Sequence, residues 1–200
     1  MKILSLDIST KTGYCVLEID NEKYNLIESG TIKQQEKPKL DYPDDYLMWG
    51  NNCANDIINI IKKHNPDHLV IEETSKGSKN NFSQKILEFI HYLVGKYIVE
   101  NKIPRTYYFT EQWRRICGCV MNDAEKAQGK SVRTQRKDGI KVAKNLEGKR
   151  IGKITRKHVN VRRANEIFNL NLILKNEDQA DSLLLAYAYY LEELREVKEC

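Results

Sequence analysis

The chain has 200 residues, of which 40% are hydrophobic and 30% charged, with a net charge of +5. This length and composition suit one α/β domain with a full core, and no linker divides it. No apolar run approaches the roughly 20 residues that cross a bilayer, and no basic-then-apolar leader opens the chain, so we expect a cytoplasmic protein. The five cysteines include one pair, Cys117 and Cys119, without a partner pair at zinc-finger spacing, which favours reduced thiols over a zinc site.

The charge is distributed unevenly. Residues 126–163 hold 14 lysines and arginines against two acids, a net +12, whereas the remaining residues hold 19 against 26, a net −7. Such a segment can be a solvated surface insertion, since glycines punctuate it. A cationic segment on an acidic body is also typical of an arm that binds the phosphates of a nucleic acid, and we favour this interpretation.

The first predicted strand covers residues 2–8, because an apolar run is followed by turn chemistry at Thr10-Lys11-Thr12-Gly13. Strands over 14–19 and 24–33 follow after short turns and predict a meander, with the polar third strand near a sheet edge. Asp7 stands directly after the first apolar run. An unpaired carboxylate is costly there, so we expect Asp7 to be neutralised, ion-paired or bound to a metal.

The following elements alternate between helix and strand. Apolar spacing predicts a helix from Leu47 to Ile61, a buried strand over 68–71 that ends in Glu72-Glu73, and a helix over 83–100 with an unusually wide apolar face. Such a face is most often core, and its surplus, which includes Ile90 and Leu93, could also bury a partner subunit. A strand is predicted over 106–109, after which Thr110 is expected to cap a helix. On this helix, Trp113 is expected to be core, and Arg114 is expected to face solvent or phosphate. After the basic segment, helices are predicted over 155–168 and 177–193.

Asp178 and Asp181 share one face of the first turn of the last predicted helix. Helix-dipole and capping effects alone can account for such acids. Together with Asp7 and Glu72, however, they could meet at the C-terminal edge of the sheet. Four carboxylates gathered there would repel each other unless cations joined them, and two Mg²⁺ ions would balance the charge and activate a water molecule.

The order of these elements resembles the RuvC-type Holliday junction resolvases of the RNase H-like superfamily, in particular phage-encoded members. The matching segments are LDISTKTGY, PDHLVIEE, FTEQWRRICG and EDQADSLLLAYAYY. The resemblance implies an α/β fold with an RNase H-like mixed five-stranded sheet flanked by helices, in one domain over residues 1–200. A basic insertion over about 119–153 would precede the C-terminal helices. The family pattern places its glutamate first after the strand, which favours Glu72 over Glu73.

The resemblance also implies a homodimer that nicks opposed strands of four-way or other branched DNA during recombination and repair. The catalytic and metal-binding residues would be Asp7, Glu72, Asp178 and Asp181, with two Mg²⁺ ions per site and Mn²⁺ as a substitute. DNA-binding residues are expected at Lys137, Lys141, Lys144, Lys153, Arg156 and Lys157. The last three are also candidates for the family's catalytic lysine, and Phe82 is the aromatic residue nearest to the place of the family's junction wedge.

Two other classes fit parts of the sequence. The segment LDISTKTG also resembles the phosphate-binding hairpin of actin and sugar-kinase ATPases, but the second phosphate hairpin and the adenosine segment of those proteins are missing here. A non-catalytic DNA-binding or packaging factor could use the same fold. Intact acids at all four positions argue against such a loss of catalysis.

Overall fold

The computed structural model describes residues 1–20, 23–74, 81–128, 137, 139 and 154–199. Most of the predicted basic insertion, including Lys141, Lys144 and Lys153, lies outside the described residues. Within the described ranges, no helix is long and apolar enough to cross a membrane.

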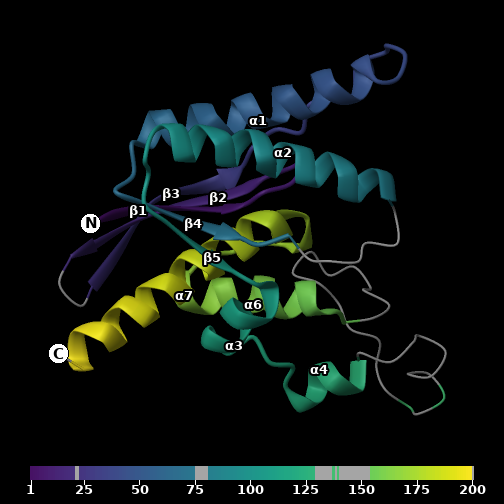
Figure 1. The fold of residues 1–200 in the computed structure, drawn as a ribbon. Helices are drawn as coiled ribbons and strands as arrows, with labels where there is room; N and C mark the ends of the chain where they lie inside the picture. Colours follow the sequence, from purple (N-terminus) through teal and green to yellow (C-terminus); the bar gives the residue numbers. More distant parts are fainter. Residues whose placement is uncertain (21–22, 75–80, 129–136, 138, 140–153, 200) are drawn as a thin grey trace.

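A mixed five-stranded sheet forms the centre of the fold, in the order β3-β2-β1-β4-β5 (Figure 1). The chain enters it through an antiparallel meander, and β4 and β5 then run parallel to β1. The strands are β1 (Lys2–Asp7), β2 (Gly13–Asp20), β3 (Lys23–Thr31), β4 (His68–Glu72) and β5 (Arg105–Tyr108). The predicted fold class is confirmed, and the polar third strand is at an edge as expected.

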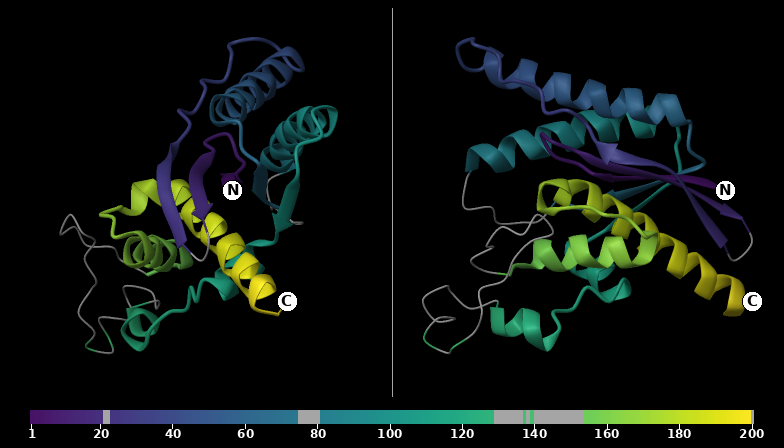
Figure 2. Two further views of the ribbon diagram at one scale, coloured as in Figure 1. Left: turned by 90° about the vertical axis from the view of Figure 1, so that its left-hand side faces the viewer. Right: turned by 180° about the vertical axis from the view of Figure 1, so that it is seen from behind.

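Helices cover both faces of the sheet (Figure 2). One face carries α1 (Asp44–His64) and α2 (Asn81–Glu100), which also pack against each other. The other face carries α7 (Glu177–Glu199), against which α3 (Thr110–Ile116) and α6 (Arg156–Phe168) pack. Two short elements that the sequence did not predict are α4 (Asp123–Gln128) and the 3-10 turn η1 (Leu174–Asn176).

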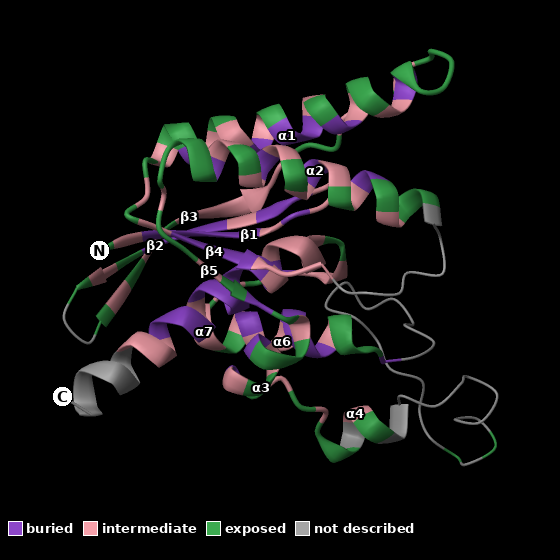
Figure 3. Ribbon diagram, viewed as in Figure 1, coloured by how far each residue is buried: buried purple, intermediate pink, exposed green. Residues whose placement is uncertain are grey.

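Side chains alternate along β1, and this divides the core between the two faces. Figure 3 shows that the central strands are largely buried between the helices. Leu4 and Leu6 point toward α1 and α2, whereas Ile3 points toward α7. Ser5 is the polar exception on the α7 face: it is completely buried, and its hydroxyl donates a hydrogen bond of 2.7 Å to the carbonyl oxygen of Ser182. This bond fixes α7 against the central strand.

Gly13, the first residue of β2, lies directly against the first turn of α7. A Cβ atom at this position would be 1.8 Å from the carbonyl oxygen of Asp178. Real carbon atoms cannot approach so closely, so only glycine lets the start of α7 reach the ends of the strands. The sequence suggested only a turn here.

One detail of the predicted helices is wrong. Phe109, not Thr110, is the N-cap of α3, and Thr110 is the first helical residue. The wide apolar face of α2 is mostly core, because it packs against both α1 and the sheet. Ile90 is completely buried, and Leu93 is partly buried against the same cluster. Ile90 therefore cannot form a subunit interface.

Candidate active site

The two predicted strand-end acids lie side by side. Asp7 ends β1 and Glu72 ends β4, and the parallel register pairs Leu6 with Ile71 immediately before them. Because alternate side chains share a face, Asp7 points to the α7 side, and Glu72 points to the same side as Val70. The carboxyl ends of neighbouring parallel strands thus place both acids on one face at one edge.

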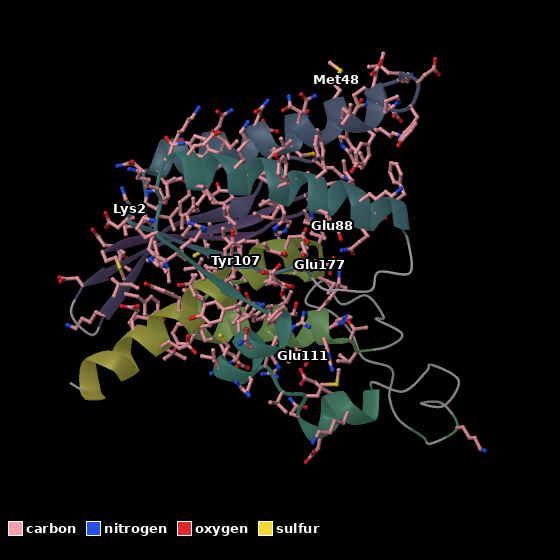
Figure 4. The ribbon with its side chains drawn as sticks, in the orientation of Figure 1. Lys2, Met48, Glu88, Tyr107, Glu111 and Glu177 are labelled. Carbon is pink, nitrogen blue, oxygen red and sulfur yellow. The ribbon has the colours of Figure 1, made fainter. Side chains whose placement is uncertain are left out.

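The first turn of α7 brings Asp178 and Asp181 to the same place. Burial raises the pKa of Asp7 well above its usual range, and the negative charges of Glu72, Asp181 and Asp178 raise it further. All four acids singled out in the sequence are therefore close enough to influence one another. This acid cluster lies between α7 and α3. Figure 4 labels the first residue of α7, Glu177, and a residue of α3, Glu111.

Glu73 is directed elsewhere. Its backbone N–H donates to the carbonyl oxygen of Tyr108 at 2.9 Å, so it continues the pairing between β4 and β5. Its carboxylate accepts hydrogen bonds from the backbone N–H and the hydroxyl of Thr74, at 3.1 and 3.3 Å. Glu72, and not Glu73, thus belongs to the acid cluster.

Two residues of α3 hold the carboxylate of Glu72. The indole N–H of Trp113 donates to Oε2 at 2.9 Å, and the hydroxyl of Thr110 donates to Oε1. Trp113 is completely buried, so its N–H requires a partner inside the protein. The sequence had predicted that Trp113 is a core side chain and that Thr110 caps a helix. It did not predict their hydrogen bonds to Glu72, because these bonds link residues from distant parts of the chain.

Asp181 is held from α6 and α3. The side-chain amide of Asn160 donates to its Oδ1 at 2.8 Å, and the guanidinium of Arg114 lies 3.9 Å from Oδ2. Burial nevertheless raises the pKa of Asp181 to about 7. Arg114 was expected to face solvent or phosphate, but its side chain is only 20% exposed and its guanidinium lies over the Trp113 ring. No sequence pattern around Asn160 had indicated its contact with Asp181.

The other neighbours of the cluster are basic. Lys11, from the turn between β1 and β2, forms an ion pair of 2.7 Å with Asp178. Lys157 pairs with Glu177, and its charge lowers the pKa values of both Asp7 and Asp181.

The other residues that were predicted to bind DNA and that the structure describes, Arg156 and Lys137, are exposed on the surface. Arg156 is 70% exposed and lies 3.9 Å from Glu111. Lys137 is also exposed. His158, a histidine of the basic stretch that could touch DNA or assist catalysis, accepts a hydrogen bond from the backbone N–H of Thr155 and closes a capping box.

The chemistry of these side chains fits a hard divalent cation, because every acid offers carboxylate oxygens. Next to Asp181, two buried polar atoms, Oδ1 of Asn160 and Nε of Arg114, have no hydrogen-bond partner among the described residues. Across the same ranges, no three His, Cys, Asp or Glu side chains are already gathered as a metal site. Asp178, for example, would have to exchange Lys11 for a cation.

No protein-family model and no curated protein sequence matches the chain. Among solved structures, Thermus thermophilus RuvC in complex with a Holliday junction substrate has a TM-score of 0.64 at 11% identity, over 98% of this chain and 96% of that one. The Thermus thermophilus RuvC structure gives 0.63 at 13% identity, over 98% and 97%. The yeast mitochondrial Holliday junction resolvase Ydc2 gives 0.54 at 15%, over 98% and 82%. The chain therefore has the RNase H-like fold of the RuvC-type resolvases, as its sequence predicted.

Proposed function

We propose that residues 1–200 form one nuclease domain that nicks four-way or other branched DNA in a divalent-metal-dependent reaction. The observation that carries this proposal is the convergence of Asp7, Glu72, Asp178 and Asp181 at one sheet edge, with the pKa values of Asp7 and Asp181 raised by burial and mutual repulsion. The similarity of the fold to RuvC supports the choice of branched DNA. The protein would work in the cytoplasm, or in that of a host cell if a phage encodes it.

The four acids would hold two Mg²⁺ ions, with Mn²⁺ as a substitute. When bound, such ions activate water and neutralise the developing charge on a phosphodiester. The chain's own residues keep the acids in place: Trp113 orients Glu72, and Asn160 orients Asp181. Lys157 adds positive charge beside the acids, where a phosphate would otherwise be repelled.

The basic segment would bind the DNA arms through their phosphates. Neutralising Lys137, Lys141 and Lys144 together should weaken binding and flatten the dependence of log K on log salt by about 0.9 for each phosphate that is no longer neutralised. Filter binding of a four-way junction over a range of salt concentrations measures this slope. An unchanged slope would mean that the basic segment is a solvated surface insertion and does not bind DNA.

Symmetric nicking of two strands would require a homodimer, whose two-fold axis presents two identical sites. Because Ile90 is part of the core, we place the interface on the outer surface of α2 and on the edge strand β5. There, Tyr92, Val99 and Tyr107 are 65%, 58% and 41% exposed around one groove. Lys96 and Glu100 line the same groove and pair with each other at 3.8 Å; such an exposed pair is weak, so each can exchange its partner for the opposite charge of a second copy.

The decisive experiment incubates labelled four-way junction, fork and linear duplex with the protein, with and without Mg²⁺. The wild type should nick the branched substrates only with Mg²⁺, whereas Asp7→Asn and Glu72→Gln should bind the junction without nicking it. If a variant nicks DNA at the wild-type rate, the residue replaced in it is not part of the active site. Junction binding without nicking by the wild type would favour a non-catalytic binding or packaging factor, and ATP hydrolysis would favour an ATPase.

A further inference from the structure

A groove of about 560 Å³ lies next to the acid cluster, on the side of α3 and the start of α6. Its lining includes Glu73, Phe109, Thr110, Arg114 and Arg156. This volume is within the range of pockets that take small ligands. The lining combines one aromatic ring with two basic and two acidic side chains, so the groove suits a flat ring that has a charged group beside it.

The groove is continuous with the acid cluster, because two residues belong to both. Thr110 lines the groove and donates its hydroxyl proton to Glu72, and Arg114 lines it and lies 3.9 Å from Asp181. If a DNA strand binds with one phosphate at the acids, a neighbouring nucleotide of the same strand will therefore lie in the groove.

Phe109 is the aromatic side chain of the groove, and it is 56% exposed. Its backbone is fixed on both sides, because its N–H donates to the side chain of Gln112 at 2.8 Å and its carbonyl accepts from the N–H of Gln112 at 2.9 Å. The ring is thus presented from an ordered position. An exposed aromatic ring on a fixed backbone next to a charged site is well suited to stack on a base.

Two arginines border this ring, and the two acids of the lining are each engaged, Glu73 by Thr74 and Glu111 by Arg156. Arg156 is 70% exposed and only loosely paired, at 3.9 Å, with the 86% exposed Glu111, so that a phosphate can compete for it. Arg114 has a buried Nε atom without a partner among the described residues. An aromatic platform beside guanidinium groups is the combination with which proteins hold a single-stranded nucleotide.

We propose that this groove is a nucleotide subsite in which Phe109 stacks on an unpaired base of the strand being cut and Arg156 contacts the adjoining phosphate. The proposal rests on the proposed function and deepens it. A base within a duplex is stacked between its neighbours, whereas a base at a branch point can turn its face to the ring. The subsite would thus favour branched over linear DNA.

The test measures junction affinity in EDTA, where no cleavage occurs. Phe109→Ala should bind a four-way junction about tenfold more weakly than the wild type, within the range known for removing one aromatic ring from beneath a base. Phe109→Tyr keeps the ring and should bind as the wild type does. Tyr42→Ala is the matched control, since Tyr42 is 77% exposed and precedes α1. Melting temperatures show whether each variant is folded.

A second arm identifies the base. In a series of junctions that each lack one base near the branch point, one junction should bind wild type and Phe109→Ala equally. Affinity of Phe109→Ala within twofold of the wild type, or a weakening that persists on every junction of the series, would overturn the subsite. If Phe109→Ala binds as the wild type does and the wild type still nicks the junction, only the subsite fails. If the wild type binds no junction, both the subsite and the proposed function are refuted.

Discussion

Replacing Asp181 by Asn should stabilise the metal-free protein at alkaline pH. The pKa of Asp181 is raised from 3.8 to about 7, mainly by burial. Between these values the folded protein binds a proton that the unfolded chain releases, so stability falls as the pH rises. The shift corresponds to about 4 kcal/mol above pH 7, at about 1.36 kcal/mol per pH unit. Asparagine avoids this cost and can still accept the hydrogen bond from Asn160.

Urea unfolding in EDTA over a range of pH measures the effect. The variant's advantage should grow from under about 1 kcal/mol at pH 4 to about 4 kcal/mol above pH 7. Asp123→Asn is the matched control, because the Asp123 side chain is 99% exposed and its replacement should give no such trend. Saturating Mg²⁺ should stabilise the wild type more than the variant. A pH-independent difference between Asp181→Asn and the wild type would refute the reasoning.

Three further changes probe the supports of the site and the subunit contact. Trp113→Phe removes the N–H that holds Glu72 but keeps an aromatic ring, so calorimetric titration should show Mg²⁺ affinity reduced about 10- to 100-fold; unchanged affinity would contradict this role. Gly13→Ala brings a Cβ atom against Asp178 and should lower the free energy of unfolding by about 1–3 kcal/mol or more, measured in urea; a neutral result would mean that α7 can shift freely. Tyr92→Glu should convert a dimer into a folded monomer in sedimentation, and a persisting dimer would locate the interface elsewhere.

The positions of the four acids could be predicted because each depends on local sequence. Asp7 and Glu72 follow short apolar runs, and such runs predict buried strands whose ends lie at a sheet edge. The separation of Asp178 and Asp181 places them on one helical face whatever that helix packs against. Only the order of the strands, which the family resemblance implied, was needed to bring the acids together.

The groups that hold these acids could not be predicted in the same way. Trp113 and Glu72 are 41 residues apart, and Asn160 and Asp181 are 21 apart. Nothing in the local pattern around a tryptophan or an asparagine indicates which carboxylate it will reach. Similarly, the apolar face of α2 was recognised, but its width reflects packing on both α1 and the sheet, which periodicity alone cannot separate from a subunit contact.

The position of α7 in the chain has a consequence for biosynthesis. A ribosome makes the sheet before this helix, so the emerging protein holds Asp7 and Glu72 before Asp178 and Asp181 exist. Docking of α7 then covers one face of β1 to β4 and completes the acid cluster. We therefore expect a nascent or truncated chain without α7 to be aggregation-prone and to lack the proposed nuclease activity, since the docking that buries the core face of α7 also assembles the acid cluster.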